Sequence, residues 1–183
     1  MKVDIHNTLI PGCFELITKV LEDERGSFIK TFHQETFEDN GLDIHYTEEY
    51  FSRSKQNVFR GLHFQLPPEE CVKIVYCIDG EVIDVVLDLR VGSPTYGEHQ
   101  IFKLNDRLAN ILYIPIGLAH GFYTKSKNAT MMYKVSKSYS PAYDTGIHWN
   151  SAKIPWSNKA PIISKRDNEF INFDNFQSPF IYN

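Results

Sequence analysis

The sequence predicts an all-β protein, an antiparallel sandwich or jelly-roll barrel with a short helical and irregular C-terminal tail. Two observations lead to this class: nine or more short apolar stretches alternate with turn signals, and the first two thirds of the chain contain one convincing helical signal. The tail is rich in Asn, Pro and Ser, but Trp149 and Trp156 predict that it packs on the body. A chain of 183 residues has the length of one domain, so residues 1–183 are expected to form a single domain.

The expected strands begin with a hairpin. Residues 14–20 and 27–32 alternate in polarity, and the charged turn at residues 23–26 joins them. Residues 36–40 with Gly41 behind them predict one helical turn closed by glycine. The remaining strands are expected over residues 46–54, 58–65, 72–78, 81–89, 98–104, 111–114 and 130–139.

The dipeptide Asp79-Gly80 predicts a tight β-hairpin between the two strands on either side of it. In the second of these strands, Asp84 and Asp88 alternate with valines on one face. That alternation by itself favours a solvated outer face for the two carboxylates, with a place for Asp84 inside a site as the alternative.

Composition excludes several classes of partner. The net charge of −4 offers no general basic surface, so nucleic acid is not expected as a partner. No stretch approaches the ~18 apolar residues of a membrane span and the N-terminus lacks an apolar run, so no membrane contact or export is expected. Cys13, Cys71 and Cys77 lack metal-type spacing and are interpreted as reduced thiols of a cytoplasmic protein, packed as small hydrophobic residues.

The run Arg60-Gly61-Leu62-His63-Phe64-Gln65 and Lys73 place three basic side chains on two neighbouring strands. Along the first strand, Arg60 and Leu62 alternate with Gly61 and His63, so Arg60 and His63 are expected on opposite faces. His63 and Lys73 are each able to point into an interior lined by apolar neighbours. Titratable groups in such a place are either paired structural residues or part of an active site.

A second histidine follows a Pro-Gly turn in the motif Pro115-x-Gly117-x-x-His120. With His63 upstream, this resembles the layout of cupin barrels, in which histidines from two strands meet in the barrel mouth. Metal-binding cupins usually carry His-x-His in the first motif, whereas this chain carries Gln65 at the second position. A metal site is therefore the weaker alternative.

Further stretches are specific in combination: DERGSF (23–28), FRGLHFQ (59–65), VKIVYCIDGEVIDVVLDLRVGSPTYG (72–97), YIPIGLAHGFYT (113–124), YKVSKSYSP (133–141), IHWN (147–150) and SKRD (164–167). Over about residues 14–170 they resemble the dTDP-4-dehydrorhamnose 3,5-epimerases, which act on nucleotide-linked 4-keto-6-deoxyhexoses. The resemblance implies a cupin-type jelly roll and an isomerase of deoxysugar and surface-polysaccharide synthesis. It also implies that a nucleotide-diphosphate sugar is the partner and that the protein is a homodimer with exchanged N-terminal strands.

Epimerisation next to a ketone removes one proton and returns another to the opposite face. The neighbouring carbonyl holds the charge as an enolate, so the implied reaction needs a base, an acid and an oxyanion donor, and we expect no cofactor and no metal. By the resemblance, His63 is the base, and Asp167 orients its imidazole. Tyr133 is the acid, and Lys73 stabilises the enolate oxygen.

The resemblance also implies a set of substrate contacts. Arg60 suits a bidentate contact, and His120 completes the polar cavity, held there by Asp84. The whole set is Arg25, Phe28, Glu48, Tyr50, Arg60, His120 and Tyr139.

Several positions depart from the family pattern. Lys30 stands where many relatives carry a glutamate, Glu48 and Tyr50 where a glutamine and an asparagine are usual, and Cys71 where a glutamine is usual. The catalytic set is intact while part of the binding set is rewritten, so the nucleotide and the number of inverted carbons stay open. The alternatives are a single-centre epimerase or a 3,4-ketoisomerase of another sugar, for example a CDP-linked one, a metal-dependent cupin, and a protein that only binds sugar.

Overall fold

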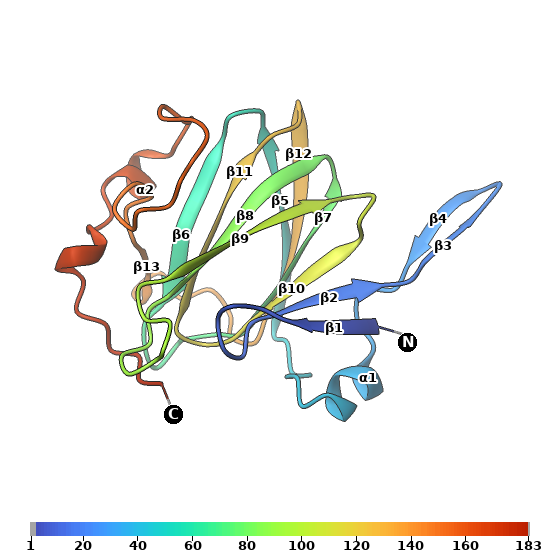
Figure 1. The fold of residues 1–183 in the computed structure, drawn as a ribbon, viewed down its shortest axis with the longest axis horizontal. Coiled ribbons are helices and arrows are strands. Elements are labelled where there is room, and N and C mark those ends of the chain that lie inside the picture. The colour runs from blue at the N-terminus through green and yellow to red at the C-terminus, as the bar shows by residue number, and fades with distance from the viewer. Residues whose placement is uncertain (1–2, 183) are drawn as a thin grey trace.

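The computed structural model describes residues 3–182 and confirms the all-β prediction (Figure 1). Two short α-helices, α1 (Gln34–Asp39) and α2 (Lys165–Asn168), and one 3-10 helix, η1 (Phe173–Asn175), accompany the strands. Within the described range, no helix has the length and apolar character needed to cross a membrane. The strands are β1 (Val3–Asn7), β2 (Phe14–Thr18), β3 (Val20–Asp23), β4 (Gly26–Ile29), β5 (Glu48–Lys55), β6 (Phe59–Gln65), β7 (Lys73–Asp79), β8 (Glu81–Asp88), β9 (His99–Asn105), β10 (Asn110–Ile114), β11 (Leu118–Thr124), β12 (Asn128–Val135) and β13 (Asp144–Gly146).

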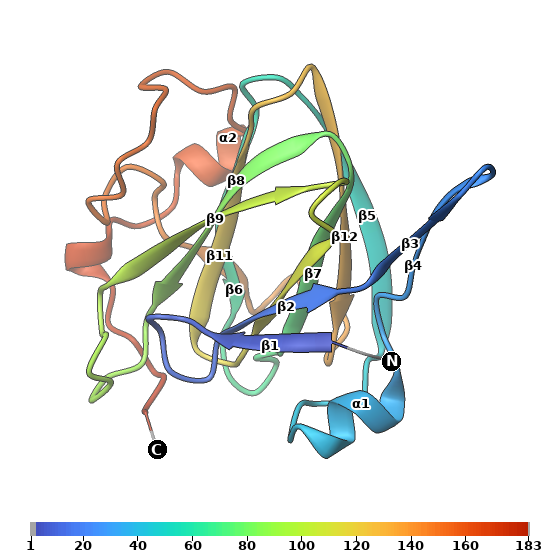
Figure 2. The ribbon, with the colours of Figure 1, turned by 45° about the vertical axis from the view of Figure 1, so that its right-hand side comes forward.

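Two antiparallel sheets face one another and form a jelly-roll barrel (Figures 1 and 2). The six-stranded sheet has the order β1-β2-β10-β7-β12-β5, and the five-stranded sheet has the order β13-β6-β11-β8-β9. Neighbours in these orders are mostly distant in sequence, so the chain passes repeatedly from one sheet to the other.

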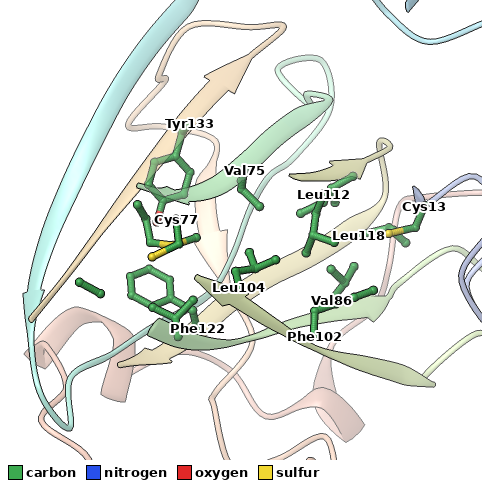
Figure 3. Close-up of a cluster of buried hydrophobic side chains, with 14 of the residues drawn as sticks. Cys13, Val75, Cys77, Val86, Phe102, Leu104, Leu112, Leu118, Phe122 and Tyr133 are labelled. Atoms are coloured by element: carbon green, nitrogen blue, oxygen red, sulfur yellow. The ribbon is translucent and has the colours of Figure 1, made fainter. Parts of the chain in front are cut away.

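Apolar side chains from both sheets fill the barrel interior. Val75 and Leu112 come from the six-stranded sheet, and Val86 from the five-stranded sheet. Tyr133 and Phe122 lie at one end of this cluster (Figure 3), and the same two residues line a polar cavity. The hydrophobic core therefore ends where that cavity begins.

The C-terminal tail packs on the outer face of the five-stranded sheet, as its tryptophans predicted (Figure 1). The rings of Trp156 and Phe59 meet edge to face with centroids 4.9 Å apart, and Trp156 Nε1 donates to the carbonyl of Trp149 at 2.8 Å. Since burying an indole needs a partner for its N–H, this bond allows the tail to cover the sheet. The tail brings α2 to the edge of the barrel.

The prediction of a hairpin at Asp79-Gly80 is wrong, because the strands on either side of it do not pair with each other. The turn exists, but β7 pairs with β10 and β12, whereas β8 pairs with β11 and β9. Both strands are buried over most of their length and have neighbours on both sides. A strand with two partners has no free edge, so this turn carries the chain across to the other sheet.

The first predicted hairpin is shorter than expected. Residues 14–18 form β2 inside the six-stranded sheet, and only β3 and β4 pair as a hairpin. That hairpin projects away from the barrel in both ribbon views (Figures 1 and 2). Leu21 and Phe28 are cross-strand partners in it, and both are exposed.

The solvated face expected for Asp84 and Asp88 is also wrong, because both carboxylates are fully buried. Asp88 accepts hydrogen bonds from Arg90 Nε at 2.9 Å, Ser93 Oγ at 2.6 Å and Thr95 Oγ1 at 2.7 Å. Burial alone raises the pKa of Asp88, but these donors outweigh it and lower the pKa. The valines that alternate with Asp84 and Asp88 thus belong to a strand, β8, that is buried on both faces.

We predict that Gly61→Ala destabilises the barrel strongly. The residue has a φ of 131°, and an added Cβ would lie 2.5 Å from the Cα of Gly121 on β11. Backbone strain and overlap together should lower the free energy of unfolding by on the order of 3 kcal/mol in urea titrations. Gly92→Ala is the matched control, since Gly92 has a φ of 87° but nothing near its Cβ position, and it should cost about 1 kcal/mol. Equal losses in the two variants would contradict the close approach of β6 and β11.

Candidate active site

A cavity of about 400 Å³ opens between the two sheets at one end of the barrel. Eight of the side chains predicted from the sequence to form a site line it: Glu48, Tyr50, Arg60, His63, Lys73, His120, Tyr133 and Tyr139. They come from β5, β6, β7, β11, β12 and the segment after β12. Residues distant in sequence are thus gathered by the passage of the chain between sheets.

A β-bulge places Arg60 and His63 on the same face of β6. Their spacing of three residues would put them on opposite faces of a regular strand, as the sequence analysis expected. In the structure, Arg60 is paired with Phe122 and His63 with His120, so two residues of β6 oppose the single residue Gly121. The extra residue shifts the alternation by one, and both basic side chains enter the cavity.

His63 is paired with Asp167 from α2. The Asp167 carboxylate lies 3.0 Å from His63 Nε2 and also accepts the backbone N–H of Gly61 at 3.2 Å. The first turn of α2 is capped by Ser164, whose Oγ accepts the N–H of Asp167 at 3.0 Å. Burial opposes ionisation of Asp167, but the hydrogen bond and charge of His63 prevail and lower its pKa to about 2.

Two groups meet His63 Nε2: the Asp167 carboxylate at 3.0 Å, which accepts, and Arg166 Nη2 at 3.1 Å, which donates. The carboxylate favours the tautomer that carries the proton on Nε2, which leaves Nδ1 with the free lone pair. Burial lowers the pKa of His63, and the nearby charges of Lys73 and Arg166 lower it further, against the opposing effect of Asp167. The imidazole is therefore neutral at neutral pH and able to accept a proton.

Lys73 lies beside His63 on β7. Its Nζ donates to the carbonyl of His63 at 3.1 Å, and the side chain is buried. One of the three N–H donors of the ammonium is used in this way. The bond fixes a positive charge next to the imidazole at the wall of the cavity.

Tyr133 extends from β12 into the cavity and is 7% exposed. Its ring stacks on that of Tyr50, and its hydroxyl lies 3.4 Å from Ser52 Oγ. Burial raises the pKa of Tyr133. The phenol therefore keeps its proton at neutral pH and is available as a proton donor.

His120, which lines the cavity, forms a second histidine–carboxylate pair with Asp84, which does not line it. Nε2 and Oδ2 are 2.8 Å apart, and both side chains are buried. Asp84 lies opposite Phe122 in the β8–β11 register, which makes it the diagonal neighbour of His120 on the same face. Burial raises the pKa of Asp84 in spite of His120.

Two predicted contacts, Arg25 and Phe28, lie outside the cavity. Both are on the projecting β3–β4 hairpin, where Arg25 pairs with Asp23 and Phe28 is 61% exposed. Within a single copy of the chain, the structure does not bring them to the other site residues.

Sequence reasoning missed Arg166. Its Nη2 lies 3.1 Å from His63 Nε2, and its guanidinium pairs with Asp144 on β13. It directly precedes Asp167 in the SKRD stretch, and that adjacency was the available signal. Lys137, Gln65, Ser52 and Cys71 also line the cavity. The cationic lining residues Arg60, Lys73, Lys137 and Arg166 outnumber the acidic Glu48 and Asp144, which suits an anionic ligand.

The donor set offers little to a metal ion. Across residues 3–182, no three His, Cys, Asp or Glu side chains gather as metal ligands. Gln65, which stands where a metal-binding cupin carries histidine, donates to the carbonyls of Glu69 and Ser138 and accepts the N–H of Ser140. Its amide is thus engaged in holding backbone. The groups that remain are a neutral imidazole, a protonated phenol and an ammonium around one hollow, which suit proton transfer next to a carbonyl.

Comparison with known proteins gives a consistent result. The family model described as dTDP-4-dehydrorhamnose 3,5-epimerase matches residues 7–175. A dTDP-4-dehydrorhamnose 3,5-epimerase of Shigella flexneri is 37% identical over 180 residues, which cover 95% of this chain and 99% of that protein. A dTDP-4-dehydrorhamnose 3-epimerase of Streptomyces niveus is 37% identical over 163 residues, 87% of this chain and 79% of that protein. The crystal structure of a dTDP-6-deoxy-D-glucose-3,5-epimerase from Legionella pneumophila, in complex with dTDP-4-keto-L-rhamnose, superposes with a TM-score of 0.94 at 31% identity and covers all of both chains.

We predict that Asp167→Asn loses stability in a pH-dependent way. The pKa of Asp167 is lowered to about 2 in the folded protein, below the value of about 3.9 expected when unfolded. The carboxylate therefore stabilises the fold above about pH 4, and this contribution is lost as the pH falls through the folded pKa. In urea titrations, the difference in the free energy of unfolding between wild type and variant should decrease by about 2 kcal/mol as the pH is lowered from 5 to 2. Asp174→Asn, at an exposed position of the same tail, is the control and should show no such narrowing. A constant gap for Asp167→Asn would refute the paired carboxylate.

Proposed function

Because the chain belongs to the dTDP-4-dehydrorhamnose 3,5-epimerase family, we propose that it inverts carbon 3, carbon 5 or both of a dTDP-linked 4-keto-6-deoxyhexose, with His63 as base and Tyr133 as acid. The protein is an epimerase, hence an isomerase, of the dTDP-rhamnose type of deoxysugar synthesis. The observation that carries the assignment of roles is the single cavity that His63, Lys73 and Tyr133 share.

In the first step, the imidazole of His63 removes the proton from the carbon next to the ketone. The Nε2–H group donates to Asp167, and Nδ1 takes the proton. The imidazolium that results is stabilised by the negative charge of the Asp167 carboxylate, which lies 3.0 Å away. A positioned base of this kind contributes about 10²–10⁴-fold to the rate.

Lys73 stabilises the enolate oxygen that forms at carbon 4. Its ammonium is already anchored to the carbonyl of His63, so it needs little reorganisation when charge develops. The low exposure of the side chain strengthens the interaction, because little water competes for it. One such donor is typically worth about 10²–10³-fold in rate.

In the second step, Tyr133 returns a proton to the opposite face of the carbon. The phenol approaches from β12 in the six-stranded sheet, whereas His63 approaches from β6 in the five-stranded sheet. A sugar bound between the sheets thus has the base on one side and the acid on the other. Because burial raises its pKa, Tyr133 is protonated when the enolate forms.

The cations of the cavity wall bind the diphosphate and orient the sugar. Arg60 is held by two hydrogen bonds, from Nε to Ser54 Oγ at 2.9 Å and from Nη2 to the carbonyl of Arg53 at 3.3 Å, so Nη1 is the terminal nitrogen left for the substrate. His120, Glu48 and Tyr139 complete the polar lining. A cytoplasmic location stays a prediction, since it rests on the free thiols expected from the sequence.

The proposal includes a homodimer in which the β3–β4 hairpin reaches the cavity of a second copy. A two-stranded hairpin has little stability of its own, and this one exposes Leu21 and Phe28. Docking on a partner would cover that apolar pair and deliver Arg25 and Phe28 to the nucleotide-sugar there. This accounts for two predicted contacts that lie far from the cavity of their own chain.

We predict that the protein incubated in heavy water with dTDP-4-keto-6-deoxyglucose incorporates deuterium at carbon 3, carbon 5 or both. Proton NMR identifies the carbon, and a parallel sample with the CDP-linked sugar tests the nucleotide. His63→Ala should lose incorporation almost completely, by more than about 10²-fold. His99→Ala, at a histidine outside the cavity lining, is the matched control. Full incorporation by His63→Ala would show that the base is misassigned.

We predict complementation between two defective variants. Arg25→Ala alone should fail below saturating substrate and His63→Ala alone at any concentration. After the two are unfolded and refolded together, a mixed dimer with exchanged hairpins has one intact site, so about a quarter of all sites recover. If the hairpin serves its own chain, every site keeps one defect and no activity returns.

A further inference from the structure

We infer that Tyr50 is a positioning residue for Tyr133: its ring holds the plane of the acid's ring and shields it, so that Tyr50 acts on the proton return through Tyr133 and not through the substrate. The inference rests on the proposed function for the role of Tyr133. Its geometric part, that one ring restrains the other, stands independently of the reaction.

The two rings form a directly opposed cross-strand pair. Tyr50 on β5 is the register partner of Tyr133 on β12. Their centroids are 4.8 Å apart and their planes differ by 14°, which is a parallel stack. Opposed aromatic pairs on antiparallel strands stabilise one another, because the backbone fixes both Cβ atoms at contact distance.

Other contacts restrain Tyr133 weakly. Its hydroxyl lies 3.4 Å from Ser52 Oγ, which is long for a hydrogen bond between hydroxyl groups. The ring of His120 meets it edge to face with centroids 6.2 Å apart. The stack with Tyr50 is the tightest of these ring contacts and therefore contributes most to the orientation of the phenol.

The same face of β5 supports the site at every second residue. Glu48 Oε2 accepts the backbone N–H of Tyr139 at 2.8 Å, and Ser54 Oγ accepts from Arg60 Nε at 2.9 Å. Tyr50 and Ser52 lie between them and contact Tyr133. β5 is the edge strand of its sheet, and its alternating side chains hold three groups that line the cavity.

Exposure differs sharply between the two rings. Tyr50 is 42% exposed, whereas Tyr133 beneath it is 7% exposed. Tyr50 thus covers one face of the acid at the mouth of the cavity. A ring in this position keeps water from the phenol and limits its rotation, and small errors in the position of a reacting group are costly in rate.

The test compares Tyr50→Phe, which keeps the ring, with Tyr50→Leu, which removes it. Tyr50→Leu should lower kcat for deuterium incorporation about tenfold, with KM changed by less than about twofold, and Tyr50→Phe should keep a higher kcat than Tyr50→Leu because it retains the ring. Tyr50→Val is a second ring-less variant should the leucine variant fold poorly. Phe51→Ala is the matched control, since Phe51 is an exposed aromatic on the same strand outside the cavity lining.

A double-mutant cycle decides the route of the effect. If Tyr50 acts through Tyr133, adding Tyr50→Leu to Tyr133→Phe causes no further loss beyond about twofold. If the two losses multiply, or if Tyr50→Leu raises KM alone, Tyr50 contacts the substrate and the inference is wrong.

A measurement without substrate separates this inference from the reaction. In protein with ring-labelled tyrosine, the Tyr133 signals are identified by their loss in Tyr133→Phe. Ring flipping of Tyr133 should be slow in wild type and Tyr50→Phe, and fast in Tyr50→Leu. Equal flip rates would overturn the inference. A wild type that incorporates no deuterium would refute the proposed function and leave this comparison of flip rates valid.

Discussion

The site depends on one backbone constraint, the bulge at which two residues of β6 oppose Gly121 on β11. Without the extra residue, Arg60 and His63 would point to opposite faces, and only one of them would reach the cavity. The close approach of the two strands at Gly61 leaves no room for a side chain. The same glycine gives its N–H to Asp167. The irregularity therefore aligns the base, a cation and the orienting carboxylate in one step.

Three buried carboxylates show how partners, and not burial alone, decide the charge inside this barrel. Asp88 and Asp167 each accept several hydrogen bonds, and their pKa values are lowered. Asp84 has one described partner, His120, and its pKa is raised. As a result, Asp167 is ionised next to the proposed base His63, whereas Asp84 beside His120 holds its proton more tightly. A single barrel thus maintains carboxyl groups whose pKa values are shifted in opposite directions.

Strand patterns and the tail tryptophans predicted the fold, and eight of the side chains expected in a site line one cavity, while their catalytic roles stay a prediction. The failures have physical causes. Asp79-Gly80 predicted a hairpin because local turn chemistry cannot reveal that both strands already have partners in different sheets. Alternation alone favoured solvent for Asp84, because it looks the same whether one face or both are buried, whereas the family resemblance placed Asp84 beside His120, where it lies. The bulge at Gly61 and the role of Arg166 depend on contacts between distant segments, which period and spacing do not encode.

The carboxylate that orients His63 is supplied by a helix more than a hundred positions further along the chain. A ribosome releases the strands that carry His63, Lys73 and Tyr133 before it releases α2, so the base emerges before the carboxylate that orients it. Proteolytic removal of the tail would take away Asp167 together with the lining cation Arg166, so the base would no longer be oriented. The base and its orienting carboxylate thus belong to segments far apart along the chain, and the packing of the tail on the barrel brings them together.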